Sequence, residues 1–447
     1  VLAIALVLAA GVATLILGNG AYSSLHETRE RYYEDYRFGD VFADVTRAPM
    51  GLMRDIREID GVLAAEERIV KLGLLDLPDM SEPGTMLLVS LPDGGDTGLN
   101  RLHLREGRLP DPLFAHEAVV SEGFAKAHRL RPGSPFAVVM NGQRRDLVVT
   151  GIALSPEFIY ALGPGEMMPD PRRYGIAWLP RPGIEAAFDL NGAFSNIVLK
   201  LAPGASTDRV IEALDRLTAP YGGSGAIARK DQISHAFLDA ELKQLSAMVK
   251  VLPPIFLMVA AMLVNITLAR LITLEREQIG LLKAIGYSSR AIALHYIEFV
   301  LVIATMGIAI GIAAGLWLGV GLAQLYARFF SFPFLIFTRD PAIYGLAAAI
   351  TVAAAVGGAL FAVRTAAALP PAVAMSPPAP TQYRSQMGFL NRMFSLRQTG
   401  VMVLRHVFRW PLRTASGIFG VAMSVSILVA SLWSFGSIDH MIDVTFV

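Results

Sequence analysis

The 447-residue chain has no cysteine and few charged residues. The lack of cysteine excludes disulfide frameworks, thiolate metal sites and cysteine nucleophiles. Charged residues make up 17% of the chain and hydrophobic residues 53%, whereas an ordinary soluble domain has about 25% and about 45–50%. The formal net charge of +1 provides no overall field that would favour nucleic acid. The composition excludes an ordinary soluble protein and a disordered chain, and it indicates a membrane protein without a nucleic-acid partner.

Sequence motifs for catalysis are also lacking. The chain has no G-x-x-x-x-G-K-[ST] loop that would cradle ATP, and no H-E-x-x-H zinc motif. Its eight histidines are scattered without the spacing of metal ligands. Ser121 has no G-x-S-x-G context of a nucleophile. We therefore predict no enzymatic activity, no metal site and no cofactor in this chain.

Five uncharged runs are long enough to cross a bilayer, which takes about 20 mainly apolar residues. The runs are residues 1–21 and the stretches between Lys250 and Arg270, Glu298 and Arg328, Asp340 and Arg364, and Arg413 and Asp439. They predict an α-helical transmembrane bundle.

The basic residues predict which side of the membrane each connection faces. Between Arg364 and Asp439 there are seven arginines and no acid before Asp439, and the turn after the second run is also basic. Lysine and arginine accumulate in cytoplasmic loops. Residues 22–246 contain 25 basic and 32 acidic residues, so we expect them outside. The protein is then a multi-pass membrane protein with a large domain on the outer side of the membrane.

Residues 22–246 are patterned like a folded α+β domain. The alternating residues predict a strand before and a strand after Asn141-Gly142, a pair that favours a tight hairpin. Charged helices are expected at 27–35 and at 231–250, and the latter has no helix breaker before Pro253-Pro254. We interpret these two helices as a stiff stalk and not as simple linkers. The other predicted elements are strands at 85–91, 117–121, 136–140, 147–152 and 196–201 and a helix at 207–217.

The turn after the second run has the most informative sequence. Ile279, Leu282 and Ile285 recur at the spacing of a short amphipathic helix. Gly286 can end this helix in a left-handed cap, and Ser288 can cap the next one. Such a helix can lie at the membrane surface and still contact a protein partner, although a plain interfacial turn would have the same pattern.

This turn resembles the signature of FtsX-like permeases, the MacB/LolC-type membrane subunits of ABC transporters, whose usual run is E-R-x-x-E-I-G-x-L-x-A-x-G-x-S. Gln278 replaces the usual glutamate, and Glu275-Arg276 lie one place closer to Ile279 than in that run. In the family this segment is the coupling helix that docks on a separate ATPase subunit, which binds the ATP and magnesium. The residues that match in spacing are Ile279, Gly280, Leu282, Ala284, Gly286 and Ser288.

The resemblance implies that residues 275–290 contact the ATPase subunit and receive the force of its ATP-driven movement. Ile279, Leu282 and Ile285 would be the apolar contact, with Lys283 and Arg290 at its rim. The full set of expected coupling residues is Glu275, Arg276, Glu277, Gln278, Ile279, Gly280, Leu282, Lys283, Ala284, Ile285, Gly286, Ser288 and Arg290.

Other segments also resemble this family. Glu298 falls where the family has a glutamate, and it is a candidate intramembrane ionisable residue. It precedes a stripe of glycines that would let helices pack closely. In the outer region, Glu106-Gly-Arg108, Glu117–Ser121, Gly133 and Leu147–Ile152 resemble the MacB-type periplasmic core domain. The glycines of the stripe are Gly307, Gly311, Gly315 and Gly319.

The end of the chain resembles the start of a second copy of the preceding unit, which consists of one span, the outer domain and three further spans. Gly420-Val-Ala-Met423 repeats Gly11-Val-Ala-Thr14 with one change, and a basic segment containing Pro411 precedes it. We interpret both chain ends as cuts in a longer, duplicated protein. The expected segments are transmembrane helix 1 at 1–21, a periplasmic MacB-like domain with stalk helices at 22–246, an FtsX-like domain with three transmembrane helices at 247–364, a cytoplasmic linker and basic helix at 365–413, a fifth transmembrane helix at 414–438 and a second periplasmic region from 439–447.

The resemblance implies the permease subunit of a bacterial ABC transporter that exports or extracts a lipophilic or peptide-like substrate. Such a subunit is a multi-pass protein of the bacterial inner membrane, and its large domain lies in the periplasm. Its expected partners are the ATPase subunit, membrane lipid, and a periplasmic adaptor, lipoprotein or hydrolase. A membrane regulator that activates a periplasmic cell-wall hydrolase and an ATP-independent secondary transporter remain alternatives.

Overall fold

The computed structural model describes residues 2–76, 84–92, 98–166, 168–337, 340–368, 370–375 and scattered residues between 414 and 433. The chain divides into two compact units. The first comprises residues 1–17, 248–317 and 340–447, and the second comprises residues 18–247 and 318–339. Residues 376–413, most of the fifth predicted span at 414–438, and the predicted second periplasmic region lie outside the described residues. The proposed second copy therefore stays a prediction.

Four helices in the described part of the chain are long and apolar enough to span a membrane, and they coincide with the first four predicted runs. One of them, α6, continues through Pro253 and Pro254, where the sequence suggested a helix breaker. Proline is tolerated within membrane helices because neighbouring groups can satisfy the freed carbonyls. The four helices are α1 (Leu2–Asp35), α6 (Ile233–Leu274), α8 (Ser289–Phe329) and α9 (Pro341–Ala368).

Glycines bring two of these helices together in the first unit. A Cβ atom added to Gly307 would lie 2.8 Å from the Cβ of Leu8, and one added to Gly311 would lie 2.6 Å from the Cβ of Val12. Gly315 approaches α1 in the same way, whereas Gly319 lies in the second unit and is half-buried. Because lipid provides no hydrophobic force between helices, close backbone packing at small residues stabilises such a contact.

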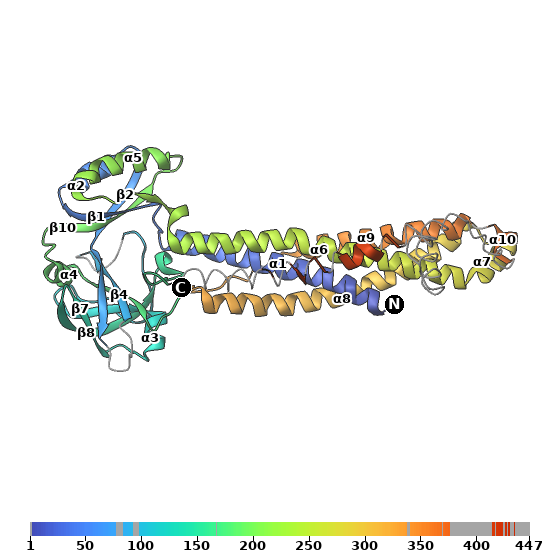
Figure 1. The fold of residues 1–447 in the computed structure, drawn as a ribbon, viewed down its shortest axis with the longest axis horizontal. Helices are drawn as coiled ribbons and strands as arrows, with labels where there is room; N and C mark the ends of the chain where they lie inside the picture. Colours follow the sequence, from blue (N-terminus) through green and yellow to red (C-terminus); the bar gives the residue numbers. More distant parts are fainter. Residues whose placement is uncertain are drawn as a thin grey trace, which may run out of the picture. The chain divides into compact units, whose positions relative to one another are not determined.

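The second unit contains a four-stranded antiparallel sheet in the order β11-β1-β10-β2. Helices α2 (Leu52–Arg57) and α5 (Thr207–Thr218) cover one face of it (Figure 1). Phe194, Ile197 and Leu214 are fully buried in the core between them. The strands are β1 (Val41–Pro49), β2 (Val62–Arg68), β10 (Ala193–Leu201) and β11 (Ile227–Ala228).

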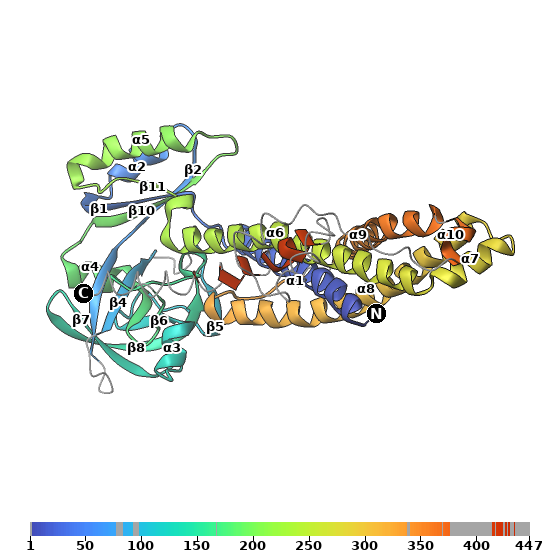
Figure 2. The same ribbon diagram turned by 45° about the vertical axis from the view of Figure 1, so that its right-hand side comes forward.

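A second sheet in this unit has the order β5-β8-β6-β9-β4-β3-β7, and Figure 2 labels its strands β4, β5, β6, β7 and β8. An additional pairing of β7 with β8 closes six of these strands into a ring, and Met86, Leu88, Val120 and Val138 are buried in its core. Helices α3 (Glu122–Ala127) and α4 (Arg181–Phe188) pack beside the ring. The strands are β3 (Val70–Asp76), β4 (Gly84–Leu91), β5 (His103–Gly107), β6 (Glu117–Ser121), β7 (Pro135–Met140), β8 (Gln143–Leu154) and β9 (Tyr174–Pro180).

The structure confirms the strands predicted from alternation and the hairpin between β7 and β8. Asn141 and Gly142 have φ values of 47° and 79°, which a two-residue turn of this kind requires. The sequence did not predict β1, β2, β3, β5, β9 or β11.

The ends of three long helices, α1, α6 and α8, lie in the second unit, one more than the two predicted stalk helices. Arg29 on α1 contacts Asp239 on α6 at 3.1 Å, and the Tyr326 hydroxyl on α8 donates to the Glu241 carboxylate on α6. After α8, the Ser331 backbone N–H donates to the Ile159 carbonyl at 2.8 Å. The first two contacts join the three helix ends to one another, and the third joins the segment after α8 to the α/β domain.

Two segments that carry the family resemblance contact each other. Arg108, which follows β5, makes a two-pronged contact with the Glu117 carboxylate at the start of β6, at 2.5 and 2.7 Å. Gly107 has a φ of 78°, and a Cβ atom there would overlap the Thr150 carbonyl. The hydrogen bonds from Arg108 lower the pKa of Glu117 below its ordinary value, and the Asp111 backbone N–H adds to this effect.

This lowered pKa predicts how stability depends on pH. Because the folded state favours the charged carboxylate, Glu117 stabilises the protein above its unfolded pKa of about 4.3 and loses this effect as the pH falls through its lower folded value. Glu117→Gln should therefore lower the unfolding temperature at pH 7, and the difference from the wild type should shrink on acidification. The exposed Glu212 provides the control, Glu212→Gln, and a difference that grows on acidification would contradict the assignment.

Candidate functional site

The predicted coupling turn forms helix α7 (Arg276–Ala284), between α6 and α8 in the first unit. Gly286 has a φ of 111°. The backbone N–H groups of Gly286 and Tyr287 donate to the carbonyls of Lys283 and Leu282, which is the Schellman pattern. The Ser288 hydroxyl accepts from the Ala291 N–H at 3.1 Å. The turn therefore has both caps that the sequence predicts.

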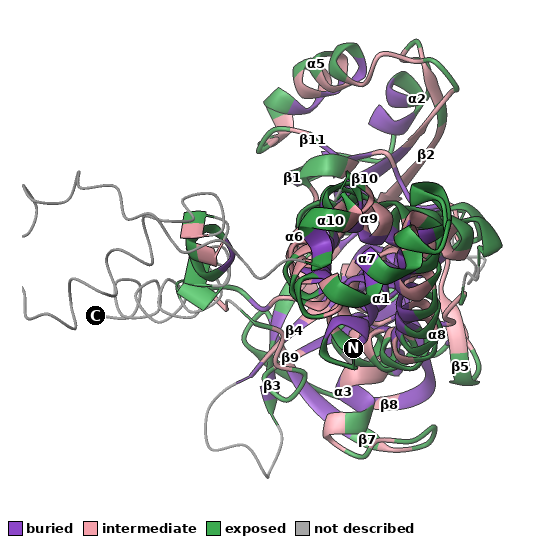
Figure 3. Cartoon of the chain, turned by 90° about the vertical axis from the view of Figure 1, so that its right-hand side faces the viewer, coloured by how far each residue is buried: buried purple, intermediate pink, exposed green. Residues whose placement is uncertain are grey.

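Burial divides α7 into an inner and an outer face (Figure 3). On the inner face, Ile279 is 2% exposed and belongs to the helix core of the first unit. Gly280 lies against the short helix α10 (Pro371–Met375), where an added Cβ would be 2.8 Å from the Cβ of Ala374. The Arg276 guanidinium donates to the Val373 carbonyl of α10. These contacts hold α7 to the bundle.

The outer face presents apolar side chains to solvent. Leu281, Leu282 and Ile285 are 55%, 40% and 69% exposed, and Tyr287 follows them at 57%. The surface available to a partner therefore differs from the predicted row. Ile279 lies in the core because its position points toward the bundle, and Leu281 takes its place on the outside.

Lys283 also departs from its predicted place at a rim. Its ammonium group donates to the carbonyls of Ala366 and Ala367 at 3.3 and 2.7 Å, at the C-terminal end of α9, where unpaired carbonyls favour a cation. Burial lowers the pKa of Lys283.

The remaining predicted coupling residues lie on both faces. Glu275 is half-buried and accepts a hydrogen bond from the Tyr296 hydroxyl at 2.8 Å. The exposed members of the predicted set are Glu277, Gln278, Leu282, Ala284, Ile285, Gly286, Ser288 and Arg290.

Glu298, the candidate intramembrane ionisable residue, lies on α8 and is exposed. In the described part of the chain, no three histidine or acidic side chains come close enough to hold a metal ion.

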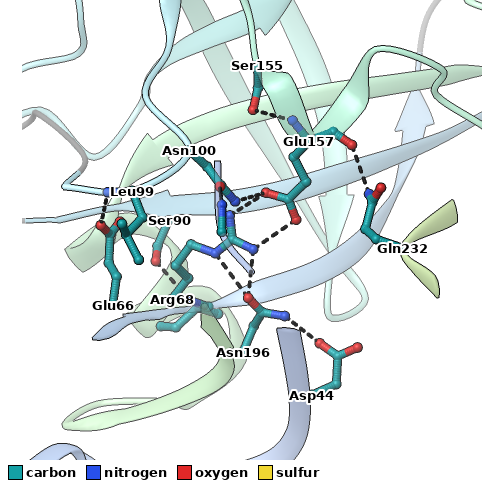
Figure 4. A network of polar contacts seen from close by, with 12 residues as sticks. Asp44, Glu66, Arg68, Ser90, Leu99, Asn100, Ser155, Glu157, Asn196 and Gln232 are labelled. Carbon is teal, nitrogen blue, oxygen red and sulfur yellow. Dashed lines mark hydrogen bonds and ion pairs between the residues drawn. The ribbon is translucent and has the colours of Figure 1, made fainter. Parts of the chain in front are cut away.

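The second unit contains a buried polar network that the sequence did not predict (Figure 4). Arg68, at the end of β2, makes a two-pronged ion pair with Glu157 at 2.7 and 2.9 Å. The Arg68 side chain is 5% exposed and that of Glu157 is 11% exposed. Arg68 also donates to the Asn196 side-chain oxygen on β10 at 2.7 Å, and the Asn100 amide donates to Glu157 at 2.8 Å. Each of the three guanidinium nitrogens of Arg68 therefore donates to at least one acceptor.

The network joins elements from both sheets to the start of α6. Asn196 donates to Asp44 on β1 at 2.6 Å, and Glu157 belongs to the turn that follows β8. Gln232, just before α6, donates to the Glu157 carbonyl at 2.9 Å and accepts from the His235 N–H at 2.8 Å. No sequence signal reveals this network, because its members are far apart in the chain and belong to different elements.

Comparison with known families identifies both regions of the chain. Residues 1–217 match the MacB-like periplasmic core domain, and residues 251–371 match the FtsX-like permease C-terminal domain. Together the two matches cover about three quarters of the chain. The chain belongs to the FtsX/MacB-like family of ABC transporter permeases. The permease thus combines membrane-spanning helices with an α/β domain, as the sequence predicts, and α7 lies within the FtsX-like range.

Solved structures also resemble part of the permease. The extracellular domain of the noncanonic ABC-type transporter YknZ from Gram-positive bacteria is 15% identical, with 42% of this chain and 98% of that chain covered and a TM-score of 0.28. The periplasmic region of MacB from Actinobacillus actinomycetemcomitans is 12% identical, with 47% and 97% covered and a TM-score of 0.29. A domain of a permease protein from Porphyromonas gingivalis is 15% identical, with 42% and 84% covered and a TM-score of 0.27. No curated protein matches the chain, and the family assignment rests on the two domain matches.

The two faces of α7 predict opposite effects of truncation. Ile279→Ala should destabilise the purified permease by about 2–5 kcal/mol, because it leaves a cavity in the core. Ile285→Ala should change the free energy of unfolding by no more than about 0.5 kcal/mol, because it removes only exposed surface. Pulse proteolysis in detergent measures both values, and the reverse ranking would contradict the assigned faces.

The buried ion pair predicts a strongly non-additive pair of substitutions. Arg68→Met alone leaves the Glu157 charge buried and should cost about 3–5 kcal/mol. Adding Glu157→Leu should cost less than the sum of the single changes, since no isolated charge remains. The exposed pair Arg31–Asp35 provides a control, in which Asp35→Ala should cost at most about 1 kcal/mol. Additive costs for the buried pair would count against the network.

Proposed function

We propose that this chain is the membrane subunit through which a separate ATPase moves a periplasmic domain in order to export or extract a lipophilic or peptide-like substrate. The observation that carries this proposal is the outer face of α7. Leu281, Leu282 and Ile285 form an exposed apolar surface in a turn between two membrane-spanning helices. An apolar patch displayed at such a turn is suited to contact with a soluble protein.

The inner face of α7 supports a mechanical role for this contact. Ile279 is buried in the helix core, and Arg276 and Gly280 contact α10. Lys283 caps α9. A force on the outer face of α7 would thus be passed to α9 and α10 through packed side chains and hydrogen bonds, which is a physical route for coupling.

Three helices offer a route from the membrane to the α/β domain. α1, α6 and α8 are each continuous between residues assigned to the first unit and residues assigned to the second. Within the second unit, Gln232 ties the start of α6 to the Arg68–Glu157 network. Because that network joins the two sheets, a displacement of α6 would reach both. We infer that ATP and magnesium bind only to the partner, that the membrane is the bacterial inner membrane and that the α/β domain lies in the periplasm.

Substitution on the outer face of α7 tests the proposed coupling. Ile285→Asp should abolish the stimulation of ATP hydrolysis by the co-purified ATPase, because it places a charge in the apolar contact. The matched control Ile285→Leu keeps the surface apolar and should retain the stimulation. Unchanged stimulation in Ile285→Asp, in a permease that still folds and still copurifies with the ATPase, would overturn the role of α7.

A further inference from the structure

We propose that the second unit holds a binding pocket for one aliphatic chain of a membrane lipid. A cavity of about 300 Å³ lies where the ends of β6 and β8 meet the start of β9 and the end of α8. Its walls are mostly aromatic and aliphatic, and the rings of Phe158 and Trp178 stand 6.1 Å apart. The principal lining residues are Phe124, Phe158, Tyr174, Ile176, Trp178 and Phe329.

The charge of the lining favours an uncharged ligand. Among the described lining residues, Glu122 is the only carboxylate, and it already contacts Lys126 at 2.9 Å and Arg105 at 3.5 Å. Burial raises the pKa of Tyr174 to about 12, and Glu157 and Glu166 add to the shift, so its phenol is neutral at physiological pH. Ser121, Ser155 and Ser331 are the other polar side chains of the lining, and the hydroxyls of Ser121 and Ser155 accept hydrogen bonds from the backbone N–H groups of Ile176 and Glu157. A pocket of this size with mostly apolar walls fits a slender apolar ligand.

The sheet extends this apolar surface beyond the cavity. In the register of the strands, Leu72 on β3 lies opposite Leu87 on β4, and Leu87 lies beside Ile176 of the pocket on β9. Residues opposite each other on adjacent strands share a face of the sheet. Leu72 and Leu74 are 49% and 54% exposed on that face. An exposed apolar strip thus lies on the same face of the sheet as the pocket residue Ile176, an arrangement that suits an extended chain better than a compact molecule.

The connection to α8 indicates where such a chain would come from. α8 is long and apolar enough to span a membrane, and its last residue, Phe329, lines the pocket together with Ser331. The pocket therefore includes the last residue of a helix that is long and apolar enough to span a membrane. A bilayer lipid is the nearest source of an uncharged, extended apolar chain. The site deepens the proposed transport function, since it would hold the lipophilic part of a substrate.

Quenching of Trp178 by brominated lipid tests this pocket. The full chain, with Trp317, Trp410 and Trp433 replaced by phenylalanine, is placed in nanodiscs of phosphatidylcholine brominated midway along one acyl chain. Trp178 lines the cavity and is 3% exposed. Its emission should be lower than in nanodiscs of the unbrominated lipid, because bromine quenches only at contact. No ATP or ATPase is present, so this test and the coupling test at Ile285 can fail separately.

A variant that fills the cavity separates pocket binding from general contact with the bilayer. Ala161 lines the cavity, and Ala161→Phe should restore the emission of Trp178 in brominated nanodiscs. The control Ala115→Phe adds the same ring at an exposed position outside the lining and should leave the quenching unchanged. Equal emission in the two lipids would overturn the proposal, and so would quenching that persists in a folded Ala161→Phe variant.

Discussion

The α/β domain depends on one buried ion pair, in which the guanidinium of Arg68 meets the carboxylate of Glu157. Two charges taken out of water are costly unless every donor and acceptor is satisfied. Here Asn196 and Asn100 supply the remaining partners, so the contact demands that β2, β10 and the turn after β8 meet in one arrangement. Gln232 adds the start of α6 to the same arrangement. The pair therefore specifies how the two sheets are joined, whereas the stability of each sheet comes mainly from its apolar core.

The membrane-spanning part is organised by a different constraint. Lipid is as apolar as the helices, so the hydrophobic effect does not drive the helices together, and their association depends on van der Waals packing and hydrogen bonds. Such packing requires close approach, and the glycines of α8 permit it against α1. The hydrogen bond from the Asn265 side chain to the Gly358 carbonyl, at 2.9 Å, joins α6 to α9. Close packing at small residues and a few polar contacts thus hold the helices of the bundle together, whereas large apolar cores stabilise the α/β domain.

The predicted coupling turn shows how much of a local structure can be predicted from the sequence. The helix, its glycine cap and the serine that starts α8 follow from local rules, because each depends on residues within one or two turns. Which face of the helix is free did not follow, because an amphipathic pattern does not say what covers the apolar side. α10 and the helix core bury Ile279 and Gly280, and the end of α9 takes the ammonium group of Lys283. The free surface is accordingly Leu281, Leu282 and Ile285.

The sequence by itself determined the scarcity of charge that marks the spans, the hairpin at Asn141-Gly142 and the family signature, because these are written in composition and in short local patterns. Only the tertiary structure decided that six strands close into a ring, that Arg108 meets Glu117 and that Arg68 meets Glu157. β2 lacks clear alternation, and in β3 the alternating Leu72 and Leu74 are exposed whereas Gly73 and Leu75 are buried, because the neighbouring elements and not the strand's own residues set which side chains are buried. Contacts between residues distant in the chain have no local signature, and they become visible only when the chain has brought them together.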